Sequence, residues 1–208
     1  EGVNERRQVM QVSMSEDLIH WSEPQIMYRD GKPWGAEEGG EMEELTEFPA
    51  KMSKSLKNVV NPDDVIRDYG ADTMRLYEMF IGDFEKAAPW SSNSIKGCKR
   101  FLERIWGLQE NVIDNDDYRD ALVGEMHRTI KKVSADIEEM KFNTAIASMM
   151  ALINDIYDAK TLTRDELMIL VRLLCPFAPH LSEELWEMLG GEGLCSLAAW
   201  PMPCRSEG

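Results

Sequence analysis

The sequence predicts a mainly α-helical protein, a helical bundle preceded by a small strand-containing segment and a polar loop. After residue 51, apolar residues recur at steps of three and four, which is the spacing of an amphipathic helix. The first 50 residues instead hold short apolar groups in loose alternation, separated by glycine-rich and acidic stretches. We therefore expect three parts, covering residues 1–50, 51–90 and 91–208.

The first part should contain two or three short strands. Apolar residues gather over residues 9–14 and again over 26–28, and Asp30-Gly31 after the second group is a strong turn signal. Residues 35–47 are rich in glycine and glutamate, which is typical of an acidic loop.

The helical part carries clear start and stop signals. Asn61-Pro62 places a capping residue and a first-turn proline ahead of two aspartates, which the positive end of a helix favours. Gly70 should end that helix, and Thr163 should cap one that ends at Cys175, where prolines follow. The other helices are expected over residues 71–81, 92–111, 117–140, 143–160 and 181–189.

The net charge is strongly acidic but uneven. The chain has 38 acidic and 23 basic residues, a net of −15, and residues 1–50 alone hold twelve acidic and four basic ones, a net of −8. An acidic total argues against a nucleic-acid partner, yet locally basic sites on an acidic protein can still bind phosphates. The apolar runs are too short for a membrane span and no targeting peptide is evident, so we expect a cytoplasmic protein without a membrane partner.

The cysteines and large apolar side chains are expected to be structural. Cys98, Cys175, Cys195 and Cys204 form no C-x-x-C pair and have no histidine at metal-ligand spacing, so we predict no metal and no disulfide. His180 is also expected to be structural. The side chains assigned to the core stripes are Met126, Met140, Met149, Met150, Met168, Trp106 and Trp186.

The residues best suited to chemistry are Lys51, Met52, Ser53, Lys54 and Ser55. Two ammonium groups three positions apart, with hydroxyls between them, suit a polyanion such as a triphosphate. The alternative for an arbitrary K-x-x-K pair is a surface loop with two solvated lysines.

The context of this pentapeptide favours the first interpretation. Together with residues 56–63 and 69–76, it resembles the signature KMSKS loop and following helices of class I aminoacyl-tRNA synthetases. Further matching stretches follow in order at residues 88–91, 97–106, 142–147, 176–186 and 200–201. Over about residues 51–201 the sequence resembles leucyl-tRNA synthetases, and the stretches at 88–91 and 97–106 favour them over their valine, isoleucine and methionine relatives.

The resemblance implies a different role for each of the three parts of the chain. Residues 51–90 would be the end of a catalytic region, residues 91–208 a helical bundle like the anticodon-binding domains, and residues 1–50 an insertion specific to the leucine enzymes. The His-x-Gly-His motif and the α/β pattern of a class I catalytic domain do not occur in the sequence. We therefore expect part of a larger enzyme that is inactive by itself.

The resemblance also implies an activity and roles for the loop residues. The whole enzyme would condense leucine with ATP, accompanied by Mg²⁺, to leucyl-adenylate and then transfer the leucyl group to tRNA(Leu), acting as a monomer. Lys54 first and Lys51 second would bind the ATP phosphates as catalytic residues, while Ser53 and Ser55 would support the loop or donate hydrogen bonds.

Two groups of basic residues are candidates for tRNA contacts. Lys96, Lys99, Arg100 and Arg104 should form one stripe on a helix, and Arg128, Lys131 and Lys132 a smaller cluster. The alternative for both is a solvated helix face. For the chain as a whole, the alternatives are a valine, isoleucine or methionine synthetase piece, or a non-catalytic RNA-binding helical module, against which the intact loop argues.

Overall fold

The computed structural model describes five short strands within the first 50 residues by their backbone, Met52, and residues 59–82, 88–113 and 120–203. The chain divides into two compact units, one of Glu1–Asn61 with Pro89–Ser91 and the other of Pro62–Ala88 with Ser92–Gly208.

The first unit contains short antiparallel strands. They are β1 (Arg7–Gln8), β2 (Met27–Arg29), β3 (Lys32–Gly35), β4 (Glu43–Glu44) and β5 (Phe48–Pro49). Strand β1 pairs with β5, and β2, β3 and β4 form a three-stranded sheet in that order. Arg29 lies opposite Lys32, so Asp30 and Gly31, which lie outside the described residues, connect two paired strands.

The expectation of a loop over residues 35–47 was wrong at β4. Glu43 and Glu44 pair with Gly35 and Trp34 of β3 and form the edge of this sheet. Charged side chains are common on edge strands, where they oppose pairing with other chains, so a pair of glutamates does not exclude a strand.

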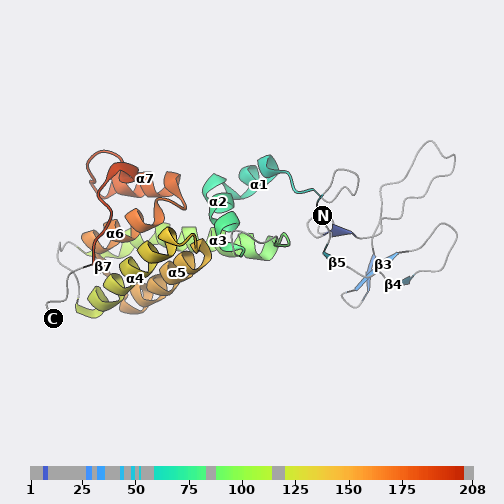
Figure 1. The fold of residues 1–208 in the computed structure, drawn as a ribbon, viewed down its shortest axis with the longest axis horizontal. Helices are drawn as coiled ribbons and strands as arrows, with labels where there is room; N and C mark the ends of the chain where they lie inside the picture. Colours follow the sequence, from blue (N-terminus) through green and yellow to red (C-terminus); the bar gives the residue numbers. More distant parts are fainter. Residues whose placement is uncertain are drawn as a thin grey trace. The chain divides into compact units, whose positions relative to one another are not determined.

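The second unit is helical and confirms the predicted fold class (Figure 1). Its helices are α1 (Pro62–Tyr69), α2 (Ala71–Phe80), α3 (Ser92–Gly107), α4 (Asp120–Glu138), α5 (Phe142–Ala159), α6 (Arg164–Leu174) and α7 (Pro179–Met188). The 3-10 turns η1 (Leu108–Asn111) and η2 (Cys195–Leu197) follow α3 and α7. Helix α7 begins two residues earlier than predicted, because a proline is readily accommodated in a first turn.

The core of this unit is built around the antiparallel pair α4 and α5, which lie side by side (Figure 1). Met126 of α4 and Met149 of α5 are fully buried, as predicted. Met140, which was assigned to the same core stripe, is instead 52% exposed. It lies in the turn between the two helices with a φ of 59°, so the helical periodicity does not extend to it.

The start of α6 is fixed by hydrogen bonds that the sequence signal anticipated. The Thr163 hydroxyl accepts the Glu166 N–H at 3.2 Å, and the Glu166 carboxylate accepts the Thr163 N–H at 2.8 Å. This reciprocal capping box is fully buried. Thr163 also belongs to β7 (Leu162–Thr163), which pairs in parallel with β6 (Val112–Ile113), a pairing too short for its sequence pattern to predict.

Candidate functional site

The predicted phosphate-binding loop is largely outside the described part of the chain. Lys51, Ser53, Lys54 and Ser55 are not among the described residues, and Met52 is exposed. Their assignment to ATP therefore stays a prediction. The second predicted site, the basic stripe, lies on α3 and is described throughout.

Helix α3 separates an apolar face from a basic one. Its buried side chains are Ile95, Cys98, Phe101, Leu102 and Ile105, which follow the spacing expected for a helix against a core. The rest of the helix carries four basic residues and one acidic residue, Glu103, a net of +3. Because the apolar face packs against the core, the basic face points away from the core.

The four basic residues have different environments. Lys96 and Arg100 are exposed and, within the described residues, have no hydrogen-bond or ion-pair partner. Lys99 is half-buried, with its ammonium 5.9 Å from the centre of the Tyr69 ring. Lys96 and Arg100 are thus the members of the stripe most available to a ligand.

Arg104, in contrast, is held against α5. Its guanidinium donates a 2.9 Å hydrogen bond to the Asn154 side chain and lies 4.6 Å from the centre of the Tyr157 ring. The Tyr157 hydroxyl in turn donates to the backbone carbonyl of Arg104 at 2.9 Å. These contacts give Arg104 a role in packing α3 onto α5.

The second basic cluster is largely neutralised on its own helix. Arg128 forms an ion pair with Glu125, and Lys132 forms one with the buried carboxylate of Asp136. Lys131 is exposed. Two of the three cations therefore already have partners, which favours the solvated-face interpretation of this cluster.

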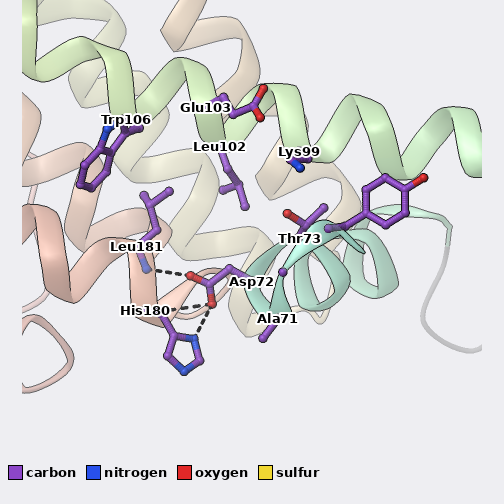
Figure 2. A pocket seen from close by; sticks show the side chains of 11 residues that line it. Ala71, Asp72, Thr73, Lys99, Leu102, Glu103, Trp106, His180 and Leu181 are labelled. Atoms are coloured by element: carbon purple, nitrogen blue, oxygen red, sulfur yellow. Dashed lines mark hydrogen bonds and ion pairs between the residues drawn. The ribbon is translucent and has the colours of Figure 1, made fainter. Parts of the chain in front are cut away.

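A trough lies beside the basic stripe, between α3 and the N-terminal ends of α2 and α7. We call it the α3 trough; it has a volume of about 450 Å³. Its lining includes Tyr69, Ala71, Lys99, Leu102, Trp106 and Leu181. Figure 2 shows Trp106 and Leu102 projecting from α3 toward α2 and α7. The trough thus combines an apolar surface and aromatic rings with a lysine.

The position of Trp106 corrects the prediction that it belongs to the core. It is 40% exposed, because it lies on the trough side of α3 and not on the buried stripe. Trp186 is only 7% exposed, as predicted. The free cysteines Cys98, Cys175 and Cys195 are also buried, whereas Cys204 lies outside the described residues.

One end of the trough is organised by Asp72, a residue that the sequence reasoning missed. Its carboxylate accepts hydrogen bonds from the backbone N–H groups of Leu181 at 2.7 Å and His180 at 3.4 Å (Figure 2). The His180 ring Nδ1 lies 2.8 Å from the same carboxylate. The sequence signal for this role is Ala178, which occupies the N-cap position of α7 and has no side-chain oxygen to accept the first N–H groups of that helix. A cap for α7 must therefore come from elsewhere in the chain.

Two family models match the chain. Residues 47–91 match the model described as class I tRNA synthetases for isoleucine, leucine, methionine and valine. Residues 120–207 match the anticodon-binding domain of tRNA ligase. Helix α3 lies between these two matches.

Curated relatives are similar over most of the chain. A leucine–tRNA ligase of Alkaliphilus oremlandii is 58% identical over 158 residues, 76% of this chain and 20% of that protein. One of Borreliella burgdorferi is 42% identical over 180 residues, 85% of this chain and 21% of that protein. The chain thus spans about a fifth of the length of these relatives.

A solved structure is also similar. It is the ternary complex of Agrobacterium radiobacter K84 agnB2 LeuRS-tRNA-LeuAMS, with a TM-score of 0.66 and 34% sequence identity. The match covers 74% of this chain and 23% of that one.

Among the described residues, none of the helices is long and apolar enough to cross a membrane. In the same residues no group of three or more histidine, cysteine, aspartate or glutamate side chains could hold a metal ion.

Proposed function

The chain belongs to the leucyl-tRNA synthetase family, and we propose that it supplies two binding functions to a leucine–tRNA ligase. The loop of residues 51–55 would bind the phosphates of ATP, and the basic face of α3 would bind tRNA. The complete enzyme would join leucine to ATP, releasing pyrophosphate, and transfer the leucyl group to the 3′ end of tRNA(Leu). Relatives named for leucine support this amino acid over valine, isoleucine and methionine.

The proposed role of the loop is electrostatic. Attack of the leucine carboxylate on ATP moves negative charge onto the departing pyrophosphate, and a positioned ammonium group stabilises that charge in the transition state. Lys54 is proposed for this contact and Lys51 for a second one, with hydrogen bonds from Ser53 and Ser55. Mg²⁺ would enter with ATP as part of the substrate.

The test is Lys54→Ala in a full-length enzyme that contains this sequence. We expect leucine-dependent pyrophosphate exchange to fall by about a hundred-fold, as for the loss of one transition-state donor. Lys141→Ala is the control, because Lys141 is an exposed lysine that pairs with its neighbour Glu139. Exchange that is unchanged in the Lys54 variant would contradict the assignment.

The proposed tRNA contacts rest on one observation above all. Lys96 and Arg100 project from a helix of net charge +3 in a chain of net charge −15, and both are without partners in the described part of the chain. A cation without a carboxylate partner is available to a phosphate, and such contacts give binding that depends on salt but not on sequence. The α3 stripe would therefore position tRNA without reading its bases.

A double variant tests the tRNA contacts. Lys96→Ala with Arg100→Ala should weaken binding of a tRNA(Leu) transcript and reduce the slope of log affinity against log salt by about two, one for each lost phosphate contact. Arg128→Ala is the matched control, because that guanidinium already pairs with Glu125. Equal affinities of the double variant and the unaltered protein at low and high salt would refute the proposed contacts.

The proposal also includes the compartment and the state of assembly. A monomer in the cytoplasm is proposed, and the three buried free cysteines are consistent with a reducing environment. Sedimentation of the full-length enzyme tests the monomer, and a stable dimer at micromolar concentration would exclude it.

A further inference from the structure

We propose that the α3 trough binds one unpaired nucleotide of the tRNA, with its base against Trp106 and its phosphate near Lys99. This inference rests on the proposed tRNA contacts of α3 and adds a base-binding pocket to them. It requires that the trough be open, that its chemistry suit a nucleobase, and that the phosphate contacts of α3 lie beside it.

The exposure of Trp106 is the first argument. Tryptophan is one of the largest apolar side chains, yet Trp106 is 40% exposed and lies in a hollow of about 450 Å³. This volume falls within the range of small-molecule sites. An exposed aromatic ring in a hollow offers a surface on which a planar group can stack.

The chemistry of the lining is the second argument. Leu102, Leu181 and Ala71 supply an apolar surface, while Lys99 brings an ammonium group to the same trough. Aromatic rings combined with nearby cations are the usual means of binding unpaired nucleotides, because every base has a face that can stack. The Lys99 ammonium has no carboxylate partner among the described residues and can approach a phosphate.

Two carboxylates also line the trough, and they affect a bound nucleotide in different ways. The Asp72 carboxylate already accepts hydrogen bonds from the N–H groups at the start of α7, and these hydrogen bonds stabilise its negative charge. Glu103 is exposed at the rim and lies on α3 between Lys99 and Trp106. A carboxylate there repels a phosphate but accepts hydrogen bonds from the amino group of a base, which favours a bound base over a bound phosphate at that point.

The position of the trough relative to the basic stripe is the third argument. On a helix, Lys99 and Trp106 share one face, and Lys96 and Arg100 lie on the adjacent exposed face. An RNA strand whose phosphates follow Lys96 and Arg100 therefore passes along the edge of the trough. A base that is not paired within the RNA can turn from that path into the trough.

The experiment measures binding of a tRNA(Leu) transcript to the 208-residue chain and to a full-length enzyme that contains it. Trp106→Ala should weaken binding by about ten-fold, the effect of losing one stacked base. Trp106→Phe, which keeps a ring, should stay within about three-fold of the unaltered protein. The salt dependence should be unchanged in both, because no phosphate contact is removed.

Two further variants separate loss of the pocket from loss of folding. Ala71→Phe fills the trough without removing any side chain from it and should weaken binding as much as Trp106→Ala. Trp200→Ala is the matched control, because Trp200 has a similar exposure of 36% and lines a different hollow beside α4. Circular dichroism should show the same helix content in all of these variants.

Chemical probing of the RNA bases identifies the nucleotide. In the unaltered complex we expect one unpaired base to be protected, and this protection to disappear with Trp106→Ala. Unchanged affinity of Trp106→Ala and Ala71→Phe, or an equal loss with Trp200→Ala, would overturn the pocket. So would iodide quenching of the full-length enzyme without RNA that is the same in the unaltered protein and in Trp106→Phe, because Trp106, one of six tryptophans in this chain, would then be covered by another part of the polypeptide.

The pocket and the proposed tRNA contacts can fail separately. If Lys96→Ala with Arg100→Ala weakens binding while Trp106→Ala does not, the basic face binds tRNA and the pocket proposal is wrong. If neither variant changes binding, the tRNA role of α3 is wrong as well.

Discussion

The carboxylate of Asp72 accepts the backbone N–H of Leu181 at 2.7 Å, which joins two residues 109 positions apart. Asp72 lies in the first turn of α2, and Leu181 lies in the first turn of α7. Helix α7 has no capping side chain of its own, so Asp72 caps it from another helix. This contact fixes the end of α7 that borders the α3 trough.

Removal of this carboxylate should destabilise the protein. Asp72→Ala leaves two half-buried N–H groups at the start of α7 without this acceptor, and we expect the free energy of unfolding to fall by about 1–2 kcal/mol. Urea denaturation measures the change. Asp68→Ala is the control, because Asp68 is exposed and, within the described part of the chain, pairs with its neighbour Arg67; equal losses in both variants would contradict the capping role.

The capping box of α6 gives a second stability prediction. Thr163→Ala removes the hydroxyl that accepts the Glu166 N–H inside the core, and the free energy of unfolding should fall by about 1–2 kcal/mol. Thr163→Ser keeps the hydroxyl and should retain more than half of that stability. If both variants unfold at the same urea concentration, the lost methyl group and not the cap determines the stability at this position.

These two caps differ in how far the sequence could predict them. The Thr163 cap is local, because its partner lies three residues along the chain, and it was predicted. Gly70 was likewise predicted to end α1, and its φ of 94° is a conformation that glycine adopts readily. Asp72 escaped prediction because its partners come from a distant helix that only the folded chain brings near.

The candidate site shows the same difference between local features, which the sequence predicts, and contacts between distant helices, which it does not. Helical spacing predicted that the four basic residues lie on one helix, α3, but not that Arg104 packs on Tyr157 while Lys96 has no partner among the described residues. The trough was not predicted, because it requires α2, α3 and α7 to meet. Trp106 was assigned to the core because large aromatic residues are usually buried, and that tendency cannot identify a side chain that lines a hollow.

The stability of the segment after α7 should depend on pH through Glu183. Desolvation is the largest single influence and acts to raise the pKa of this carboxyl, but the hydrogen bonds from Ser196 and the Cys195 N–H together outweigh it and lower the pKa below its usual 4.5. The folded state therefore favours the ionised form. This contribution is present above pH 4.5 and is lost as the pH falls through the lower pKa of the folded state.

Glu183→Gln isolates that contribution from the other carboxylates. The difference in free energy of unfolding between this variant and the unaltered protein should be constant above pH 4.5 and shrink as the pH falls below it. Urea denaturation at a series of pH values measures this. A difference that stays the same down to the acid limit of folding would show that the charge of Glu183 contributes nothing.

The buried cysteines should be chemically inert in the folded protein. Burial raises the pKa of Cys98 to about 11 and, with the neighbouring Cys175 adding to the effect, that of Cys195 to about 12. Because the thiolate is the reactive form, iodoacetamide at pH 8 should label neither residue in the native chain and both in urea. Peptide mass spectrometry measures the labelling, and rapid modification of Cys195 before unfolding would contradict its burial.

The last prediction distinguishes two functions within the α3 stripe. Arg104→Ala removes the hydrogen bond to Asn154 and the contact with the Tyr157 ring, so the free energy of unfolding should fall by about 1 kcal/mol. The salt dependence of tRNA binding should hardly change, because a guanidinium already held by α5 is less available to a phosphate. Lys96→Ala should have the opposite effects. Its urea denaturation should be unchanged, and the slope of log tRNA affinity against log salt should be lower by about one. A lower salt slope with Arg104→Ala would mean that this guanidinium binds phosphate while it remains packed on Tyr157.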